Sequence, residues 1–181
     1  DPLFLDGLKK EFEEIKDITV EKTRKAKLSA YQEKLASLKF LDPACGSGNF
    51  LTETYLSIRR LENDVIYELT GGQMTLGDVA SPIKVSIQQF YGIEINDFAV
   101  TVAKTALWIA ESQMMKETES IVHMVLDFLP LKTNAYIIEG NALRIDWESV
   151  VPKSELNYIM GNPPFVGYKL QTEEQKNDLI P

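Results

Sequence analysis

The stretch LDPACGSGNFL, residues 41–51, decides the fold of this chain. A short apolar strand pattern ends at Asp42, and the proline that follows it stops the strand. Gly46 and Gly48 then allow a sharp turn, because glycine accepts backbone angles that other residues avoid. A helical apolar pattern follows from residue 50 to about residue 69. Strand, glycine turn and helix in this order are typical of the opening of a doubly wound α/β unit.

The rest of the chain continues the alternation of strands with helices. Strand patterns are found at 38–41, 90–95, 135–139 and 157–160, and helical patterns at 3–37 (with an interruption near 17–19), 79–89 and 98–115. This order predicts parallel pairing and right-handed crossovers. We therefore expect an α/β fold, a partial doubly wound parallel sheet with N-terminal helices. Residues 1–37 form the helical segment and residues 38–181 the core.

Composition limits the classes of function. The 181 residues carry a net charge of −8 and a pI near 4.8, which argues against this chain alone binding a polyanion tightly. One histidine and one cysteine cannot build a zinc site, and we expect no metal. No apolar run is long enough to span a bilayer and no signal peptide opens the sequence, so a cytoplasmic protein is expected.

The glycine turn predicts a ligand other than a phosphate. A dinucleotide fingerprint requires a third glycine where Leu51 stands, and no Gly-Lys-Ser/Thr is present. Asp42 would accept a hydrogen bond from an ammonium group, whereas a phosphate site avoids a carboxylate. A tight turn with a capping Asp is the alternative. Cys45 could be read as a nucleophile, but no base is evident, and we expect the sole histidine, His123, to be a packed side chain.

Two further strand ends carry polar residues suited to a nucleoside. Glu94 closes the second strand, where an acid binds both hydroxyls of a ribose, although its separation from Gly48 exceeds the roughly 20 residues usual in dinucleotide folds. Asn141 follows the third strand and could hydrogen-bond a nucleobase edge, since its amide both donates and accepts. An ordinary turn role for Asn141 stays open, and Asp146 is the competing residue for the base contact.

The fourth strand ends in MGNPPF, residues 160–165. The prolines make this turn rigid and remove donors, which leaves acceptors. The side-chain oxygen of Asn162 and the carbonyl of Pro163 could accept both hydrogens of an exocyclic amine. That arrangement favours a pyramidal nitrogen and a direct displacement on a methyl donor, through positioning and electrostatics.

Four segments in order, DPACGSGNFL, GIEIN, GNAL and GNPPF, resemble motifs I to IV of class I S-adenosylmethionine-dependent methyltransferases. NPPF resembles the tetrapeptide of DNA adenine-N6 methyltransferases. The longer stretches GIEINDFAVTVAKTALWIAESQM and GNALRIDWESV are similar to the methyltransferase region of single-chain type II restriction–modification enzymes and related phage-exclusion methyltransferases. The similarity covers most of residues 38–170.

This resemblance implies a Rossmann-like methyltransferase core, S-adenosyl-L-methionine as cofactor, and the N6 amine of a flipped-out adenine as methyl acceptor. It implies cofactor contacts from Asp42, Ala44, Cys45, Gly46, Gly48, Asn49, Glu94, Ile95, Asn141 and Ala142. It implies catalytic roles for Asn162, Pro163, Pro164 and Phe165, with the Phe165 ring stacked on the target base.

The resemblance also implies a longer protein. We expect a bacterial enzyme whose core is truncated here after NPPF, with double-stranded DNA bound through a target-recognition domain absent from this chain. The isolated 181 residues are then expected neither to methylate DNA nor to bind it tightly. Two alternatives remain: an N-methyltransferase for a protein glutamine or an RNA base, and a degenerate core that only binds partners. An N4-cytosine product is disfavoured, because that group more often begins the tetrapeptide with Ser.

Overall fold

The computed structural model describes residues 3–71, 82–126 and 134–162, together with 171–173, 176 and 178. Four parallel strands form one sheet in the order β3-β2-β1-β4. The strands are β1 (Phe40–Asp42), β2 (Phe90–Glu94), β3 (Tyr136–Glu139) and β4 (Tyr158–Ile159). The long helices are α1 (Leu3–Lys16), α2 (Glu21–Ser37), α3 (Asn49–Thr70) and α4 (Asp97–Val122). The predicted parallel α/β sheet is confirmed.

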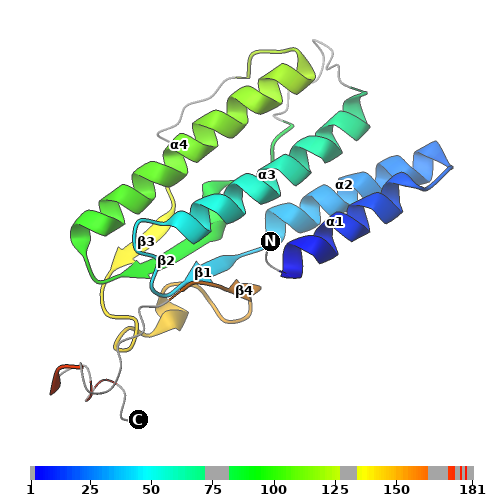
Figure 1. The fold of residues 1–181 in the computed structure, drawn as a ribbon. Helices are drawn as coiled ribbons and strands as arrows, with labels where there is room; N and C mark the ends of the chain where they lie inside the picture. The colour runs from blue at the N-terminus through cyan, green and yellow to red at the C-terminus, as the bar shows by residue number, and fades with distance from the viewer. Residues whose placement is uncertain are drawn as a thin grey trace.

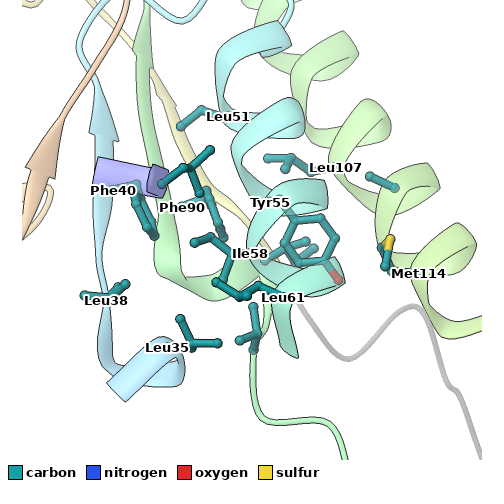
Figure 2. Close-up of a cluster of buried hydrophobic side chains, with 14 of the residues drawn as sticks. Leu35, Leu38, Phe40, Leu51, Tyr55, Ile58, Leu61, Phe90, Leu107 and Met114 are labelled. Carbon is teal, nitrogen blue, oxygen red and sulfur yellow. The ribbon is translucent and has the colours of Figure 1, made fainter. Parts of the chain in front are cut away.

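The four helices form a layer over one face of the sheet (Figure 1). The main core lies between the helices and the sheet, and Figure 2 shows Leu51 and Ile58 on the side of α3 that faces Phe40 and Phe90 of the strands. The rings of Phe40 and Phe90 stack with centroids 4.9 Å apart, and Tyr55 of α3 meets Phe90 edge-on at 5.5 Å. Aromatic rings from adjacent strands thus join the sheet to its helical cover.

The N-terminal helices share this core with the sheet. Leu5, Leu8 and Phe12 are buried in it, and the hydroxyl of Tyr31 donates to the carbonyl of Leu8 at 2.7 Å. Phe4 stacks on a tyrosine of β4 at 4.4 Å. The amphipathic pattern predicted for residues 3–37 therefore serves to cover the sheet. Across the part of the chain that the structure describes, none of the helices combines the length and apolarity needed to cross a lipid bilayer.

The helix predicted at 79–89 is wrong for its described part, residues 82–89. The segment is extended and ends in a single 3-10 turn, η1 (Ile87–Gln89), with a Ser86–Gln89 capping box. The backbone N–H groups of Lys84 and Val85 donate to the buried carboxylate of Glu62 in α3, at 2.7 and 3.1 Å. A side chain distant in sequence thus replaces the carbonyls that a helix would have offered. Residues 79–81 lie outside the described residues.

Helix α4 is longer than the predicted 98–115 and ends at Val122. His123 is its C-cap, in the left-handed conformation with φ of 53°, and its side chain is exposed. The expectation of a packed histidine was therefore wrong, because the helix continues to the residue before His123 and the left-handed cap directs the chain outward.

Candidate active site

The carboxyl ends of the parallel strands meet at one edge of the sheet, where α3 and α4 begin (Figure 1). Asp42 is paired with Gly92 in the register of β1 and β2, and Glu94 with Glu139 in that of β2 and β3. On the other side of β1, the backbone N–H of Met160 donates to the carbonyl of Leu41 at 2.9 Å. The ends of the four strands, at which the site residues were predicted, therefore lie along one rim.

Four amides of the glycine turn are bonded within the protein. The N–H of Ala44 donates to Asp42 Oδ1 at 3.0 Å, and that of Gly46 donates to Glu94 Oε2 at 2.9 Å. The N–H groups of Cys45 and Gly48 donate to backbone carbonyls at 3.1 and 2.8 Å. A phosphate loop leaves such amides free for the anion and adds no carboxylates. The bonded amides and the two carboxylates therefore disfavour a phosphate at the turn.

Asp42 is buried beneath this turn, with an exposed fraction of 1%. Among the described residues, no group donates a hydrogen bond to its Oδ2, although this oxygen is buried. Burial raises the pKa of the Asp42 carboxyl, the Ala44 N–H opposes that shift, and the nearby Glu94 carboxylate reinforces it. A buried carboxylate is stabilised by a positive charge next to it. A cationic ligand group could therefore bind to Oδ2 and favour the ionised form of Asp42.

Glu94 is only partly buried and is held at both oxygens. Its Oε1 accepts from the Asn96 N–H and its Oε2 from the Gly46 N–H, each at 2.9 Å. Each carboxylate oxygen retains a lone pair that could accept from one hydroxyl of a vicinal diol. Two apolar side chains that follow it in the chain are strongly exposed, Ile95 at 69% and Phe98 at 73%. A partly buried acid with lone pairs to spare, next to an exposed apolar surface, has the chemistry that a nucleoside requires.

The two glycines of the turn have different tasks. Gly46, with φ of 54°, has open space where a Cβ would be. Gly48, with φ of 80°, is buried, and a Cβ built there would lie 2.9 Å from the Cβ of Ala103 in α4. Gly48 thus permits close packing of α4, while Gly46 leaves room at the rim. Asn49 begins α3 with an exposed side chain that accepts from the Ser47 hydroxyl at 3.3 Å.

Cys45 directs its side chain into the core. A Cβ on Gly92 would lie 2.8 Å from its Sγ, so the glycine in β2 makes room for the thiol. Burial raises the pKa of Cys45 to about 12, and the carboxylates of Asp42 and Glu94 add to the shift. A thiol held protonated at neutral pH is a poor nucleophile, which argues against cysteine catalysis. Only main-chain atoms of Cys45 are left to line the turn.

The loop after β3 fixes Asn141 at both ends of its amide. Oδ1 accepts from the N–H of Leu143 at 3.0 Å, and Nδ2 donates to Asp178 at 2.9 Å. Ala142 is half-buried, and its carbonyl accepts from the indole of Trp147 at 2.8 Å. No local pattern indicated the Asp178 contact, because 37 residues separate the two partners.

The competing residue, Asp146, has a structural partner of its own. Its Oδ1 accepts from the N–H of Glu148 at 3.0 Å and caps the 3-10 turn η2 (Trp147–Ser149). Asn141 lies two residues beyond the end of β3, whereas Asp146 lies at the start of η2. The geometry therefore favours Asn141 over Asp146 as the polar residue of this strand end.

Gly161, two residues after the end of β4, lies against Asp42. Gly161 has φ of 147°, and a Cβ built on it would lie 2.4 Å from Asp42 Oδ1. Asn162 follows with an exposed side chain, while Pro163, Pro164 and Phe165 lie outside the described residues. The motif-based prediction did not include Gly161 among the site residues. Its position directly before NPPF was the one sequence signal that could have indicated it.

The fold is a parallel α/β domain, a class in which ligands bind outside the carboxyl ends of the strands. Comparison with known proteins narrows the class. The chain matches the family model "MmeI, DNA-methyltransferase domain" over residues 18–181. It therefore belongs to the MmeI DNA-methyltransferase domain family, and the resemblance drawn from the four motifs is confirmed.

Individual relatives agree with this assignment. DNA methyltransferase A of Bacillus subtilis is 44% identical over 182 residues, which cover 99% of this chain and 20% of that protein. The adenine-specific methyltransferase PglX of Streptomyces coelicolor is 34% identical over 74 residues, 40% of this chain and 5% of that protein. A solved structure of the type IIL restriction–modification enzyme MmeI in complex with DNA has a TM-score of 0.89 and 44% identity, and the match covers 98% of this chain and 23% of that one. The chain thus spans about a fifth of the length of DNA methyltransferase A and of the MmeI chain.

Proposed function

We propose that this domain is the core of a DNA methyltransferase that transfers a methyl group from S-adenosyl-L-methionine to the N6 amine of adenine, the activity EC 2.1.1.72, in a restriction–modification or phage-defence system. Support comes from the family, from the adenine specificity in the name of PglX, and from the similarity to MmeI, a restriction–modification enzyme. The observation that carries the proposal is the contact of Gly161, which precedes NPPF, with the buried acid Asp42 of the glycine turn.

The residues at the rim fit this cofactor. S-adenosyl-L-methionine, when bound, supplies a methyl group activated on a sulfonium, along with an ammonium group, a ribose diol and an adenine. Within the described ranges, nothing donates to the buried Oδ2 of Asp42, which leaves an acceptor for positive charge. Each Glu94 oxygen keeps a lone pair for one hydroxyl of a diol. The exposed Ile95 provides an apolar surface for a base, and Asn141 provides polar groups at the next strand end. The bonded turn amides disfavour a phosphate.

The contributions of the individual residues follow from that fit. Asp42, the turn Ala44–Gly48 and Asn49 would line the methionine end, and Glu94 would bind the ribose hydroxyls. Ile95, Asn141 and Ala142 would line the adenine end. Because Gly161 packs on Asp42, Asn162 directly follows a residue in contact with the acid of the cofactor turn.

At the catalytic corner, the Asn162 oxygen and the Pro163 carbonyl would accept both hydrogens of the target amine. Two acceptors favour a pyramidal nitrogen whose lone pair points at the methyl group, which lowers the barrier through orientation and electrostatics. Pro164 would keep the turn rigid. Phe165 would stack on the flipped base and compensate part of the unstacking free energy.

Double-stranded DNA is the proposed partner. The net charge of −8 disfavours extensive phosphate contacts by this domain itself. We propose that a target-recognition region elsewhere in the same protein supplies the basic surface, in the cytoplasm of a bacterium, and that the 181 residues alone are inactive. This chain matches only 20% of the length of DNA methyltransferase A and 23% of the MmeI chain, so both relatives have room for such a region outside the matched part.

The experiment is to incubate the full-length protein with methyl-labelled S-adenosyl-L-methionine and, in parallel, with plasmid DNA, RNA and release factor. Nucleosides from the DNA are then separated by mass spectrometry. We expect label in N6-methyldeoxyadenosine. Label in N4-methyldeoxycytidine would overturn the adenine assignment, and label on protein or RNA would favour the alternative substrates. Absence of cofactor binding by the full-length protein would favour a degenerate binding module.

A further inference from the structure

Asp178 reaches the loop after β3 from a distant part of the sequence. Its Oδ2 accepts from Asn141 Nδ2 and its Oδ1 accepts from Arg144 Nε, both at 2.9 Å. The side chain of Asp178 is only 12% exposed, whereas that of Arg144 is 52% exposed. One carboxylate thus bridges two residues of the loop that holds the candidate adenine contact.

The bridge determines which way the Asn141 amide faces. A carboxylate only accepts hydrogen bonds, so the atom of Asn141 next to Asp178 must be the nitrogen. The N–H of Leu143 only donates, so the atom next to it must be the oxygen. Both ends of the amide are therefore specified by partners of fixed polarity, and a flip would place donor against donor and acceptor against acceptor.

We propose that Asp178 is a positioning residue that orients Asn141 for recognition of the adenine base of the cofactor, an inference that rests on the proposed function. With these two bonds made, Asn141 retains one N–H on Nδ2 and one lone pair on Oδ1. The Watson–Crick edge of adenine presents one acceptor, N1, beside one donor, the 6-amino group. The remaining groups of Asn141 are complementary to that edge.

Arg144 keeps the bridging carboxylate in its accepting form. Its guanidinium, together with the Asn141 amide, lowers the pKa of Asp178, so the group stays ionised to a lower pH than an ordinary Asp carboxyl would. A protonated Asp178 would add a donor and weaken the discrimination between the two ends of the amide. Orientation before binding reduces the entropy lost when the ligand arrives.

The test uses the full-length protein and two product analogues, S-adenosylhomocysteine and S-inosylhomocysteine, with affinities from titration calorimetry. The inosine base presents an acceptor at position 6 and a donor at N1, the reverse of adenine. We expect the wild-type protein to prefer the adenosine compound by about 100-fold or more, a difference of about 2.7 kcal/mol. In Asp178→Ala, the affinity for S-adenosylhomocysteine should fall about tenfold. The ratio of the affinities for the adenosine and inosine compounds should fall to below about tenfold.

Two further variants separate orientation from folding. Asp178→Asn can still accept from Asn141 but places a donor toward Arg144, so its preference should be intermediate. Glu173→Ala removes an exposed carboxylate of the same chain segment and should behave as wild type. An unchanged preference in folded Asp178→Ala, with Asn141→Ala impaired, would overturn the role of Asp178 and leave the proposed function standing. A wild-type protein that binds neither compound would overturn the proposed function and this inference together.

Discussion

Gly161 and Asp42 are in direct contact at the rim of the sheet: a Cβ on Gly161 would lie 2.4 Å from Asp42 Oδ1 and 3.3 Å from Oδ2. The acid that ends β1 is therefore packed against the backbone that follows β4. Under the proposed function, this contact joins the cofactor side of the pocket to the corner that holds the target amine.

Substitution Gly161→Ala should separate these two groups. The added methyl must displace Asp42 or the backbone around Gly161, and φ of 147° strains any side chain at this position. We expect cofactor affinity to fall about tenfold or more, with a larger loss of turnover, because the transition state depends on the geometry of both groups. Calorimetry and single-turnover methylation of the full-length protein measure the two effects.

Gly71→Ala is the matched control for that substitution. Gly71 also has a positive φ, 63°, but nothing lies within 4 Å of a Cβ built there. The variant should lose stability by about 1–2 kcal/mol through backbone strain alone, with unchanged cofactor affinity. Equal affinity losses in the two variants would contradict the importance of the Gly161 contact.

The substitution Asp42→Asn should lower the affinity for the cofactor while it leaves the stability of the ligand-free protein unchanged or raises it. Because burial raises the folded-state pKa of Asp42 above its unfolded value, protonation favours the native state. The contribution of the protonated Asp42 to the free energy of unfolding is fully present below the pKa of the carboxyl in the unfolded chain, about 3.9. This contribution is lost as the pH rises through the pKa of the carboxyl in the folded protein. The ligand-free variant should therefore melt at a temperature equal to or above wild type at about pH 8, while its affinity for the cationic cofactor falls about tenfold or more.

Thermal melts at about pH 5 and pH 8, with and without cofactor, measure this prediction. The melting temperature of wild type relative to Asp42→Asn should decrease as pH rises. A wild-type protein that is more stable than the variant at the higher pH, without ligand, would show that Asp42 has a favourable partner within the protein.

The two glycines of the turn should respond differently to alanine. Gly48→Ala must push back Ala103 of α4, and such overpacking destabilises by about 1–3 kcal/mol beyond the strain of a positive φ. Gly46→Ala meets open space and should show the backbone strain alone, about 1–2 kcal/mol. Denaturant unfolding compares them, and a Gly46 variant less stable than the Gly48 variant would contradict this division of tasks.

Cys45 should be unreactive in the native protein. Its thiol is buried and its pKa is raised to about 12, so very little thiolate forms near neutral pH. Iodoacetamide should leave the Cys45 peptide unmodified under native conditions and alkylate it completely in denaturant, as read by mass spectrometry. Rapid native alkylation would instead indicate an accessible thiolate in the turn.

The strands and the rim could be predicted because their signals are local. Apolar runs that end at Asp42 and Glu94 place both acids at carboxyl ends of parallel strands, and parallel pairing brings those ends to one edge. The bond between Gly46 and Glu94 is a consequence of that arrangement. The distance along the chain between these motifs is taken up mainly by the long helix α3 and the segment that follows it.

The features that escaped prediction depend on partners remote in sequence. The segment before β2 is extended because Glu62, in another helix, binds its backbone N–H groups. Asn141 is oriented by Asp178, whose polar surroundings in the sequence give no sign of that contact. Neither periodicity nor a short motif encodes such pairs, since both describe only neighbours along the chain.

Methylation by the Asn162→Ala variant of the full-length protein tests the central claim most directly. With S-adenosyl-L-methionine saturating and DNA in single-turnover conditions, we expect methyl transfer to adenine to slow by about 100-fold or more, because one of the two acceptors for the amine is lost. Cofactor affinity should stay within a few-fold of wild type, since Asp42 and Glu94 are untouched. A variant that methylates adenine at the wild-type rate would contradict the assignment of this corner as the reaction centre.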